Sequence, residues 1–407
     1  PLRSPRQRGS GDQHRRARYR RVRAPVDRQD RRVAPGRPNT MKGIVCSNLY
    51  ATTSERDLKS NTLAIRELVD GARESGLNIQ AVLRFYPLVS GKGIHWPLRR
   101  DIDGLPVYDV PTIGFRHWYS VLLTRLVLFL LGFRGRFDFA ICHQTFNFTA
   151  AKRVLGRRVA KKYFVVHGSD LGKPQLGECL DEADKTFVRS HALARQLKDN
   201  HGVEPVGIVY SGIDAAEIIG LESKDISLDQ GLVITMACLL IPQKNVQPCL
   251  RAFKALVDNG VRLTVHLHGD GPLKPAIARD IEKLGLTEVV RQHGFTPRAE
   301  VLKAMRASHL FLMPSAPETF GLVYLEAMAS GCVVIGHKGW GIDGVVEDGV
   351  NGYVVATPTE AEILARIQGY LTAADRRSLH QASLKAAEAH TRDKAVANYQ
   401  QLCGAEH

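Results

Sequence analysis

The sequence predicts an α/β protein built from two parallel sheets, each covered by helices. From Met41 onward, short apolar runs of strand length alternate with amphipathic runs of helix length, which is typical of parallel α/β folds. The chain has 407 residues, more than one hydrophobic core usually supports. The alternation also restarts at Leu232 after a polar stretch. We therefore expect two similar α/β units, one after the other.

The first unit starts at Met41. Runs rich in aliphatic and aromatic residues predict strands at residues 43–46, 79–85, 137–142, 162–166, 185–188 and 206–209. Amphipathic runs between them predict helices, among them residues 61–74 and 192–198.

The second unit begins with LVITMA at Leu232. The runs LTVHLH, VVRQHG, HLFLMPS and CVVIGH follow, which predicts a second Rossmann-like unit. Residues 211–231 are polar and poor in strand signal, so they favour a linker between two domains. Ligands of open parallel sheets collect beyond the carboxyl ends of the strands, so we expect the site between the domains.

Positive charge is concentrated at the start of the sequence. The formal net charge is +15, and residues 1–40, with thirteen Arg, three Asp and neither Lys nor Glu, contribute +10 of it. This segment has too few large apolar residues to fold, so we expect disorder. One interpretation is an Arg-rich tail that binds nucleic acid or anionic lipid. The other, which the lack of Lys favours, is that upstream DNA has been read as protein and that the natural start is Met41. The rest is mildly basic, and we expect no nucleic-acid partner.

The cysteines favour a reducing compartment. They are odd in number and show no paired spacing of a disulfide framework or zinc site, so we expect reduced, mostly buried thiols in a cytoplasmic protein. The apolar run after Met41 has the length of a strand rather than of a secretory signal. The seven are Cys46, Cys142, Cys179, Cys238, Cys249, Cys332 and Cys403.

Residues 115–137, FRHWYSVLLTRLVLFLLGFRGRF, are unusually apolar. Thr124 and Arg125 interrupt the run, which is too short for the roughly 20 apolar residues that span a bilayer. Two interpretations stay open: a buried helix with solvated ends, or a helix that lies in an anionic membrane interface through Trp118, Tyr119 and several arginines. These arginines are Arg116, Arg125, Arg134 and Arg136.

The stretch APETFGLVYLEAMASG, residues 316–331, places Glu318 and Glu326 on either side of a Phe-Gly step. A strand is predicted before it, and Gly321 is predicted to open a helix that ends at Gly331. The amides and partial positive charge of a helix start suit a phosphate, and carboxylates accept hydrogen bonds from sugar hydroxyls. The spacing suits a ligand with sugar, diphosphate and ribose in series. The alternative is a helix-start charge followed by a solvated surface residue.

Two other patterns were considered as metal sites. Asp101 and Asp103 form a D-x-D pattern, but the surrounding RRDIDGLPV favours a turn. His266 and His268 lie on one face of a predicted strand at a spacing that could chelate a metal, but no third ligand is nearby in the sequence. We therefore expect no metal site.

The longer stretch PSAPETFGLVYLEAMASGCVVIGHKGWGIDGVVEDGVNGYVV closely resembles the signature of the family 4 retaining glycosyltransferases of GT-B fold. Four shorter motifs agree in order, namely HGSD at His167, YSGID at Tyr210, HGDGP at His268 and HGF at His293. The resemblance implies two Rossmann-like domains that face each other across a cleft. They are an acceptor domain at residues 41–215 and a nucleotide-sugar donor domain at 216–385, with a helix in residues 386–407 that crosses back to the first domain.

The resemblance also implies roles for single residues. By position, Glu318 binds the donor hexose, Glu326 binds the ribose, Lys244 neutralises the diphosphate, and His167 lies near the reacting anomeric centre. Further donor-binding positions are Phe320, Gly321, Leu322, Phe295 and Gly269, and the acceptor-side positions are Ser47, Asn48 and His143.

The sequence departs from the family pattern in two places. Leu239 occupies the position of an arginine that usually accompanies the lysine. Either another cation replaces it, with Lys338 and Arg298 as candidates, or helix amides suffice, or the enzyme is weak. Ser47 and Asn48 stand where two glycines are usual, which affects the acceptor side.

The implied function is a retaining, metal-independent hexosyltransferase without cofactor, which uses a nucleotide diphosphate sugar and a carbohydrate or lipid-linked acceptor. We expect a role in bacterial polysaccharide or lipopolysaccharide synthesis and a cytoplasmic location. Under the second interpretation of residues 115–137, the protein is also peripheral to the inner face of the cell membrane. The alternative, motivated by Leu239, is a catalytically silent nucleotide-sugar-binding protein of the same fold.

Overall fold

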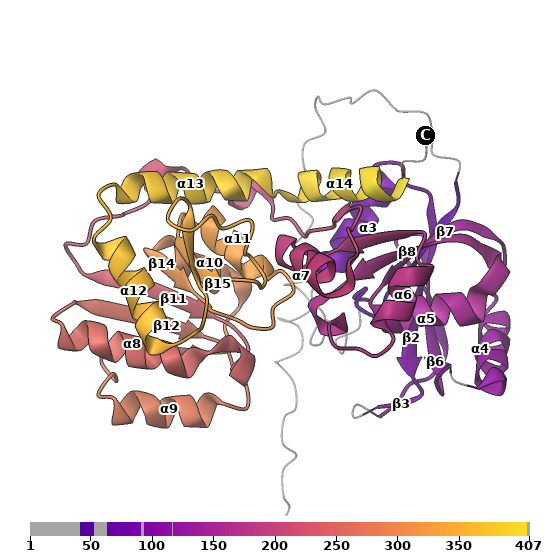
Figure 1. Cartoon of the computed structure of the whole chain (residues 1–407), viewed down its shortest axis with the longest axis horizontal. Coiled ribbons are helices and arrows are strands. Elements are labelled where there is room, and N and C mark those ends of the chain that lie inside the picture. The colour runs from indigo at the N-terminus through magenta and orange to yellow at the C-terminus, as the bar shows by residue number, and fades with distance from the viewer. Residues whose placement is uncertain (1–40, 53–62, 91–92, 116, 405–407) are drawn as a thin grey trace, which may run out of the picture. The chain divides into compact units, whose positions relative to one another are not determined.

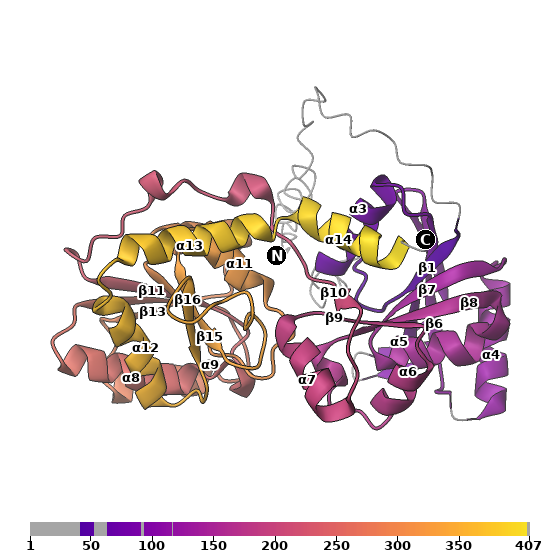
Figure 2. The same ribbon diagram turned by 45° about the horizontal axis from the view of Figure 1, so that its top comes forward.

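The computed structural model describes residues 41–52, 63–90, 93–115 and 117–404, which form two α/β domains around two separate sheets (Figures 1 and 2). This confirms the predicted fold class. The Arg-rich segment 1–40 and Arg116 lie outside the described residues. Among the helices described, none combines the length and hydropathy that crossing a bilayer requires.

The first sheet has the strand order β10-β9-β8-β7-β1-β2-β6-β5, and β5 is its antiparallel edge. A separate hairpin is formed by β3 (Val89–Ser90) and β4 (Gly93–Ile94). The sheet strands are β1 (Gly43–Cys46), β2 (Ile79–Pro87), β5 (Leu98–Ile102), β6 (Leu105–Thr112), β7 (Phe137–His143), β8 (Val159–Val166), β9 (Lys185–Val188) and β10 (Gly207–Ile208).

Helices cover both faces of the first sheet. The apolar side chains of α3 (Ala64–Glu74) pack on one face together with the C-terminal helix. The other face packs against α4 (Trp118–Leu130), α5 (Thr145–Ala150), α6 (Leu176–Glu182) and α7 (His191–His201). The chain order reverses between the neighbouring strands β1 and β7, so the loops after these two strands open a crevice, the usual position of ligands in such sheets.

The second sheet is parallel throughout, in the order β13-β12-β11-β14-β15-β16. This is the order of a Rossmann fold, whose ligand crevice lies at the switch point between the first and fourth strands, here β11 and β14. The strands are β11 (Leu232–Ala237), β12 (Leu263–His268), β13 (Val290–Gly294), β14 (Leu310–Leu312), β15 (Val333–His337) and β16 (Gly352–Val355).

The helices of the second domain form two layers. On one face lie α8 (Val246–Asp258), α9 (Lys274–Lys283) and α12 (Glu360–Leu371). On the other lie α10 (Arg298–Arg306), α11 (Leu322–Ala329) and the end of α13 (Arg376–Ala389). Both faces of the sheet are therefore buried, which explains the nearly continuous apolar runs of β11, β14 and β15 in the sequence.

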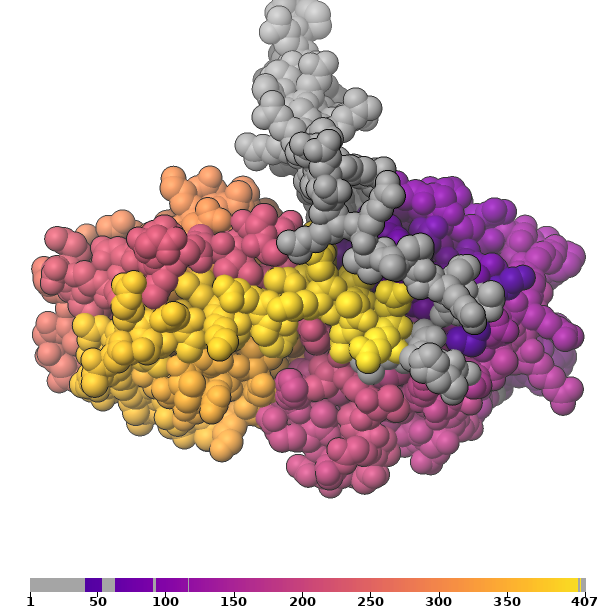
Figure 3. All heavy atoms as spheres, turned by 90° about the horizontal axis from the view of Figure 1, so that it is seen from above, coloured from indigo at the N-terminus to yellow at the C-terminus, as the bar shows by residue number. Residues whose placement is uncertain are grey.

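The C-terminal region forms two helices, and the helix expected within residues 386–407 begins at Arg392 rather than at Ala386. The helix α13 ends at Ala389, and α14 (Arg392–Gly404) begins after Thr391 and packs against α3. Thr391 pairs with Ile213 in an isolated parallel bridge, and a side chain at Gly212 would lie 2.3 Å from the Thr391 carbonyl oxygen. This pairing interrupts the helix. In Figure 3 the yellow residues of α13 and α14 form a continuous band on the surface.

The segment predicted as a linker is anchored by a buried lysine. Lys224 is 6% exposed, and its ammonium group donates to the carbonyl oxygens of Met305, Arg306 and Ser330 at 2.9–3.0 Å. Burial lowers the pKa of Lys224. Lys224 therefore fixes the linker to the second domain, although a lysine is usually exposed to solvent and the sequence alone predicts that position for it.

The D-x-D pattern forms a hairpin turn, as the turn interpretation predicted. Asp103 has a φ of 52° between β5 and β6, and the Asp101 carboxylate accepts a hydrogen bond from the Gly104 amide at 2.9 Å. Asp103 also pairs with Arg66 at 3.2 Å. These contacts give both carboxylates a structural role.

Candidate functional site

Two residues predicted for the donor site meet at the switch point of the second sheet. Lys244 follows β11 at the end of a short 3-10 turn, and Glu318 follows β14. The Lys244 Nζ lies 2.6 Å from a carboxylate oxygen of Glu318, and each side chain is 16% exposed. An ion pair of this low exposure holds both groups in defined positions.

Backbone contacts fix the loop that carries Lys244. Asn245, the next residue, has a left-handed conformation with φ 52°, and its side-chain amide donates to the Pro314 carbonyl oxygen at 2.7 Å. The Ala316 amide donates to the Gln243 carbonyl oxygen at 2.9 Å. The loops after β11 and β14 are thus joined on both sides of the ion pair.

Close packing also fixes Glu318. Its second carboxylate oxygen accepts a hydrogen bond from the Thr319 amide at 3.1 Å. The Gly341 amide donates to the Glu318 carbonyl oxygen at 3.0 Å, and a side chain at Gly341 would lie 2.8 Å from the Glu318 Cγ. Gly341 has φ 51°, so both conformation and space favour glycine there.

The helix predicted after Gly321 is α11, and it begins at Leu322. Gly321 has φ 75°, and a Cβ there would lie 2.5 Å from the Tyr324 ring. Amides in the first turn of a helix have no intrahelical acceptor and carry partial positive charge, which suits a phosphate near Gly321 and Leu322. The Phe320 side chain is buried and stacks with Tyr210 at 6.5 Å between ring centroids, so its backbone rather than its ring is suited to a ligand.

Glu326 lies one turn into α11 and forms an ion pair with Arg298, with 2.6 Å between carboxylate and guanidinium. The same guanidinium binds both carboxylate oxygens of Glu217, at 2.6 and 2.5 Å. Hydrogen bonding to Glu217 is the main cause of the raised pKa of Arg298. Arg298 is thus engaged by two carboxylates, which argues against it as the replacement for the missing phosphate-binding arginine.

The glycine-rich turn after β12 packs against the loop after β11. Gly269 has φ 136°, and a Cβ there would lie 1.8 Å from the Cys238 carbonyl oxygen. Leu239, at the position of the usual arginine, is 56% exposed, and Phe295 is 84% exposed. The turn leaves no room for a side chain at Gly269, while Phe295 has a free ring face for a flat ligand such as a base.

In the first domain, His167 belongs to a chain of buried hydrogen bonds, and its ring also accepts from the Asp170 amide. Its Nε2 lies 3.1 Å from the Nδ1 of His143, and the Nε2 of His143 lies 3.4 Å from the Tyr399 hydroxyl. Burial lowers the pKa of His143 to about 3 and also lowers the pKa of His167. Both imidazoles are therefore neutral at physiological pH.

His143 corrects one expectation. It is 0% exposed, so it has no surface for an acceptor, and its side chain contacts the ring of His167. Ser47 is likewise 0% exposed, and its amide donates to the Leu83 carbonyl oxygen at 2.9 Å. Asn48 is partly exposed, and its side-chain oxygen accepts from Asn147 at 3.3 Å. Of the three acceptor-side residues, Asn48 is thus the one with exposed surface.

A hydrogen bond joins the histidine loop of the first domain to the glutamate loop of the second. The Gly168 amide donates to the Thr319 hydroxyl at 3.1 Å, and a Cβ on Gly168 would lie 2.9 Å from that oxygen. His167 and Glu318 are the immediate neighbours of these two residues. Thr319 was not singled out in the sequence, where nothing local marks it.

Sequence reasoning also missed Arg189, a buried cation near the two histidines. It is 4% exposed and donates to the Ser211 hydroxyl at 2.5 Å, while its Nε and Nη1 have no hydrogen-bond partner within the described residues. Burial lowers its pKa to about 10. Its positive charge adds to burial in keeping His143 and His167 neutral.

Comparison with known proteins agrees with this arrangement. Residues 222–386 match the family model glycosyl transferases group 1. A D-inositol 3-phosphate glycosyltransferase of Mycobacterium sp. (strain KMS) is 29% identical over 192 residues, which is 44% of this chain and 42% of that protein. The corresponding protein of Mycolicibacterium smegmatis is 28% identical over 239 residues, 54% of each chain. The chain therefore spans about half the length of these curated relatives.

Solved structures resemble nearly the whole chain. HepE of Anabaena, in complex with UDP and glucose, has a TM-score of 0.63 at 17% identity and covers 89% of this chain and 97% of its own. Sucrose-phosphate synthase of Thermosynechococcus elongatus has a TM-score of 0.65 at 14% identity and covers 89% and 98%. The fold is therefore GT-B, and residues 222–386 match the model of the glycosyl transferases group 1.

Proposed function

We propose that this protein transfers a hexosyl group from a nucleotide diphosphate sugar to an acceptor hydroxyl, with retention of configuration and without a metal ion. The observation that carries the proposal is the Lys244–Glu318 ion pair at the switch point of the second sheet, next to the start of α11. The similarity to HepE, whose structure holds UDP and glucose, supports a nucleotide sugar as donor.

The ion pair suggests how the donor is received. A diphosphate at the start of α11 competes with Glu318 for Lys244, because it also accepts hydrogen bonds and carries more negative charge. Once Lys244 turns to the diphosphate, the Glu318 carboxylate is free to accept hydrogen bonds from hexose hydroxyls. Without donor, each residue thus partly neutralises the other.

In the proposed reaction, the bond between the anomeric carbon and the diphosphate oxygen breaks, and the acceptor oxygen bonds to the same face of that carbon. The acceptor proton passes to the leaving phosphate oxygen, so no protein nucleophile is needed. Negative charge grows on the diphosphate, where Lys244 and the first amides of α11 stabilise it. His167, which is neutral, would lie beside the anomeric centre without adding charge there.

Calorimetric titration of the full chain tests the donor site. We expect UDP, GDP or ADP, or one of their hexose conjugates, to bind with micromolar affinity in chelator-treated buffer, unchanged by added Mg²⁺. Turnover is then measured with the hexose conjugate that binds and simple sugar acceptors. If none of the nucleotides binds, the proposed function is wrong.

A second candidate is a catalytically silent nucleotide-sugar-binding protein. The observation that favours it is Leu239, which leaves an exposed apolar side chain where a phosphate-binding arginine is expected, while Arg298 is held by Glu217 and Glu326. Such a protein binds the nucleotide sugar and shows neither hydrolysis nor transfer. Nucleotide binding without turnover for any conjugate and acceptor would therefore favour this second candidate.

We also propose that α4 binds an anionic membrane surface. Such binding would bring the protein close to a membrane-anchored saccharide acceptor. It would also suit a role in bacterial polysaccharide or lipopolysaccharide synthesis. Of the two interpretations of residues 115–137, the buried helix does not hold for most of α4: Trp118 is 76% exposed and Leu130 is 73% exposed. Arg125 and Arg134 donate to main-chain carbonyls, and no carboxylate of the described residues pairs with them. The other exposed apolar side chains of α4 are Tyr119, Leu122, Leu123, Leu126 and Phe129.

A further inference from the structure

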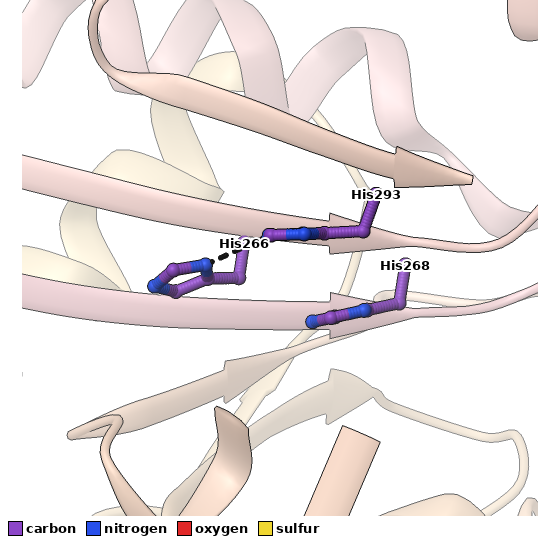
Figure 4. Close-up of side chains that lie close together, drawn as sticks. All are labelled: His266, His268 and His293. Carbon is purple, nitrogen blue, oxygen red and sulfur yellow. Dashed lines mark hydrogen bonds between the residues drawn. The ribbon is translucent and has the colours of Figure 1, made fainter. Parts of the chain in front are cut away.

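Three histidines gather at the outer edge of the second sheet. His266 and His268 project from the same face of β12, and His293 projects from the neighbouring edge strand β13 (Figure 4). One ring nitrogen of each histidine lies within 4.8 Å of those of the other two. The third ligand that the sequence around His266 and His268 lacks is thus supplied by the next strand of the sheet.

An irregularity in strand pairing gives His293 its direction. Leu267 pairs with Gln292, but His268 pairs with Gly294, so the register skips His293. An extra residue of this kind is a β-bulge, which turns a side chain away from the regular alternation and is frequent next to functional sites. The bulge brings the imidazole of His293 to 4.4 Å from that of His268 between ring centroids.

Hydrogen bonds fix the tautomer of His268. The Thr296 hydroxyl donates its single proton to the Gly294 carbonyl oxygen at 3.0 Å. It can therefore only accept from His268, whose Nδ1 lies 3.0 Å away and must carry the ring proton. The Nε2 of His268 is then left with a lone pair, and this buried atom has no hydrogen-bond partner in the part of the chain that the structure describes.

A buried lone pair without a partner needs an explanation, because such atoms usually accept a hydrogen bond or bind a cation. The Nδ1 of His266 lies 2.9 Å from the Nε2 of His293, so these two rings share one proton.

We propose that His266, His268 and His293 bind one divalent transition-metal ion of the zinc class. Nitrogen ligands about 2.1 Å from a common ion lie at most about 4.2 Å apart, so binding requires rotations that bring the nitrogens closer and turn the stacked rings toward the ion. Three imidazoles select Zn²⁺, Ni²⁺, Co²⁺ or Cu²⁺ over Mg²⁺ and Ca²⁺, which prefer oxygen. Thr296 is a positioning residue, since its hydroxyl orients His268 from the side away from the metal.

The proposed ion joins β12 to the edge strand β13. Gly269 directly follows the ligand His268, and Phe295 lies two residues after the ligand His293. Bound metal would therefore restrain both loops. This inference does not depend on the proposed transferase activity, and its test measures metal binding directly.

The test is titration of Zn²⁺ into the untagged, chelator-treated full chain, followed by calorimetry and a competing chromophoric chelator. We expect one ion per chain that is lost on His268→Gln, with an affinity at least about 100-fold lower. His293→Gln should have the same effect, and because His293 is exposed, this variant cannot disrupt the core. The exposed His201 serves as the matched control, and His201→Gln should bind Zn²⁺ like the unmodified chain.

The Thr296 hydroxyl gives a finer test. Thr296→Val has nearly the same shape and should lower the Zn²⁺ affinity about 10- to 100-fold, whereas Thr296→Ser should restore it. Substitution by Co²⁺ should give the visible absorption of a site with nitrogen ligands and no thiolate charge-transfer band. The proposal is overturned if His268→Gln and His293→Gln both bind Zn²⁺ normally, or if the Co²⁺ spectrum shows a cysteine ligand.

Discussion

The Nζ of Lys244 lies 2.6 Å from a carboxylate oxygen of Glu318, although 74 residues separate them in the chain. The two residues follow β11 and β14, which are hydrogen-bonded neighbours at the switch point of the second sheet. In the proposed function, the opposite charges of the pair serve different parts of a nucleotide sugar. Substitution of each partner should therefore affect different steps.

Lys244→Met should weaken binding of the nucleotide identified by titration about 10- to 100-fold. The substitution removes the cation that faces the diphosphate and leaves Glu318 unpaired, which repels the ligand. Calorimetric titration measures the change. Lys303→Met, at an exposed lysine on α10, is the matched control and should bind normally. Equal affinities for the Lys244 variant and the control would exclude Lys244 from the diphosphate site.

Glu318→Gln should lower turnover about 100- to 1,000-fold and leave the affinity for the free nucleoside diphosphate unchanged or higher. Glutamine keeps the size of the side chain but loses the charge that accepts hexose hydroxyls and holds Lys244. Steady-state kinetics and nucleotide titration together separate these effects. Glu326→Gln should instead weaken nucleotide binding. Normal turnover of the Glu318 variant would contradict its assignment to the hexose.

Stability should fall in mild acid because buried histidines must remain neutral. His380 is 0% exposed, and burial lowers its pKa to about 4, with Lys224 adding to the effect. Such a histidine has a lower pKa in the folded protein than in the unfolded protein, where the pKa is about 6.5. Its contribution to stability is fully present at pH values above about 6.5 and is lost as the pH falls toward the pKa of the folded protein. For His380 the loss is about 2 kcal/mol between about pH 7 and pH 5.

Urea unfolding at these two pH values measures the effect. His380→Gln should be less stable at neutral pH, because it disturbs the contacts of His380 with Tyr370 and Gly331. Its further loss of stability on acidification should be smaller by about 2 kcal/mol. His201→Gln, at an exposed position, should show the full loss. The same acid dependence in all three proteins would show that His380 does not contribute to it.

Lys224→Met should lower the free energy of unfolding by about 2–4 kcal/mol. The methionine fills a similar volume, but the carbonyl oxygens of Met305, Arg306 and Ser330 lose their shared donor. Chemical denaturation measures the loss, and Lys283→Met at an exposed lysine is the control. A change below about 0.5 kcal/mol, as is usual at the surface, would mean that the linker is not anchored by Lys224.

The double variant Trp118→Ser and Leu130→Ser should lower binding to anionic vesicles at least about 10-fold, because two exposed apolar side chains of α4 no longer enter the interface. Co-sedimentation with phosphatidylglycerol-containing vesicles measures it, with pure phosphatidylcholine vesicles for comparison. Trp96 is 75% exposed and lies outside α4, so Trp96→Ser is the matched control. Equal binding by the double variant and this control would rule out α4 as the membrane surface.

The sequence by itself determined the elements and the donor motif. Apolar runs predicted β1, β2, β7, β8, β9 and β10 and every strand of the second sheet except β16. The signal is clearest in inner strands such as β11, β14 and β15, because a strand buried on both faces is apolar along its length. The helix start at Gly321 was also predictable, since glycine at a strand-to-helix turn is a local signal. Element ends differed by a few residues, where side-chain contacts rather than propensity decide.

Tertiary structure alone decided which distant residues meet. It joined Lys244 to Glu318, the Gly168 amide to Thr319, and His143 to His167, and it left Arg189 buried without a carboxylate partner among the described residues. It also brought His293 to His266 and His268 across a strand boundary. Periodicity and turn signals report a residue's immediate neighbours, whereas strand order, register and bulges are set by packing over the whole domain. The chemistry of the site depends on those long-range contacts, and a sequence pattern carries no measure of their distances.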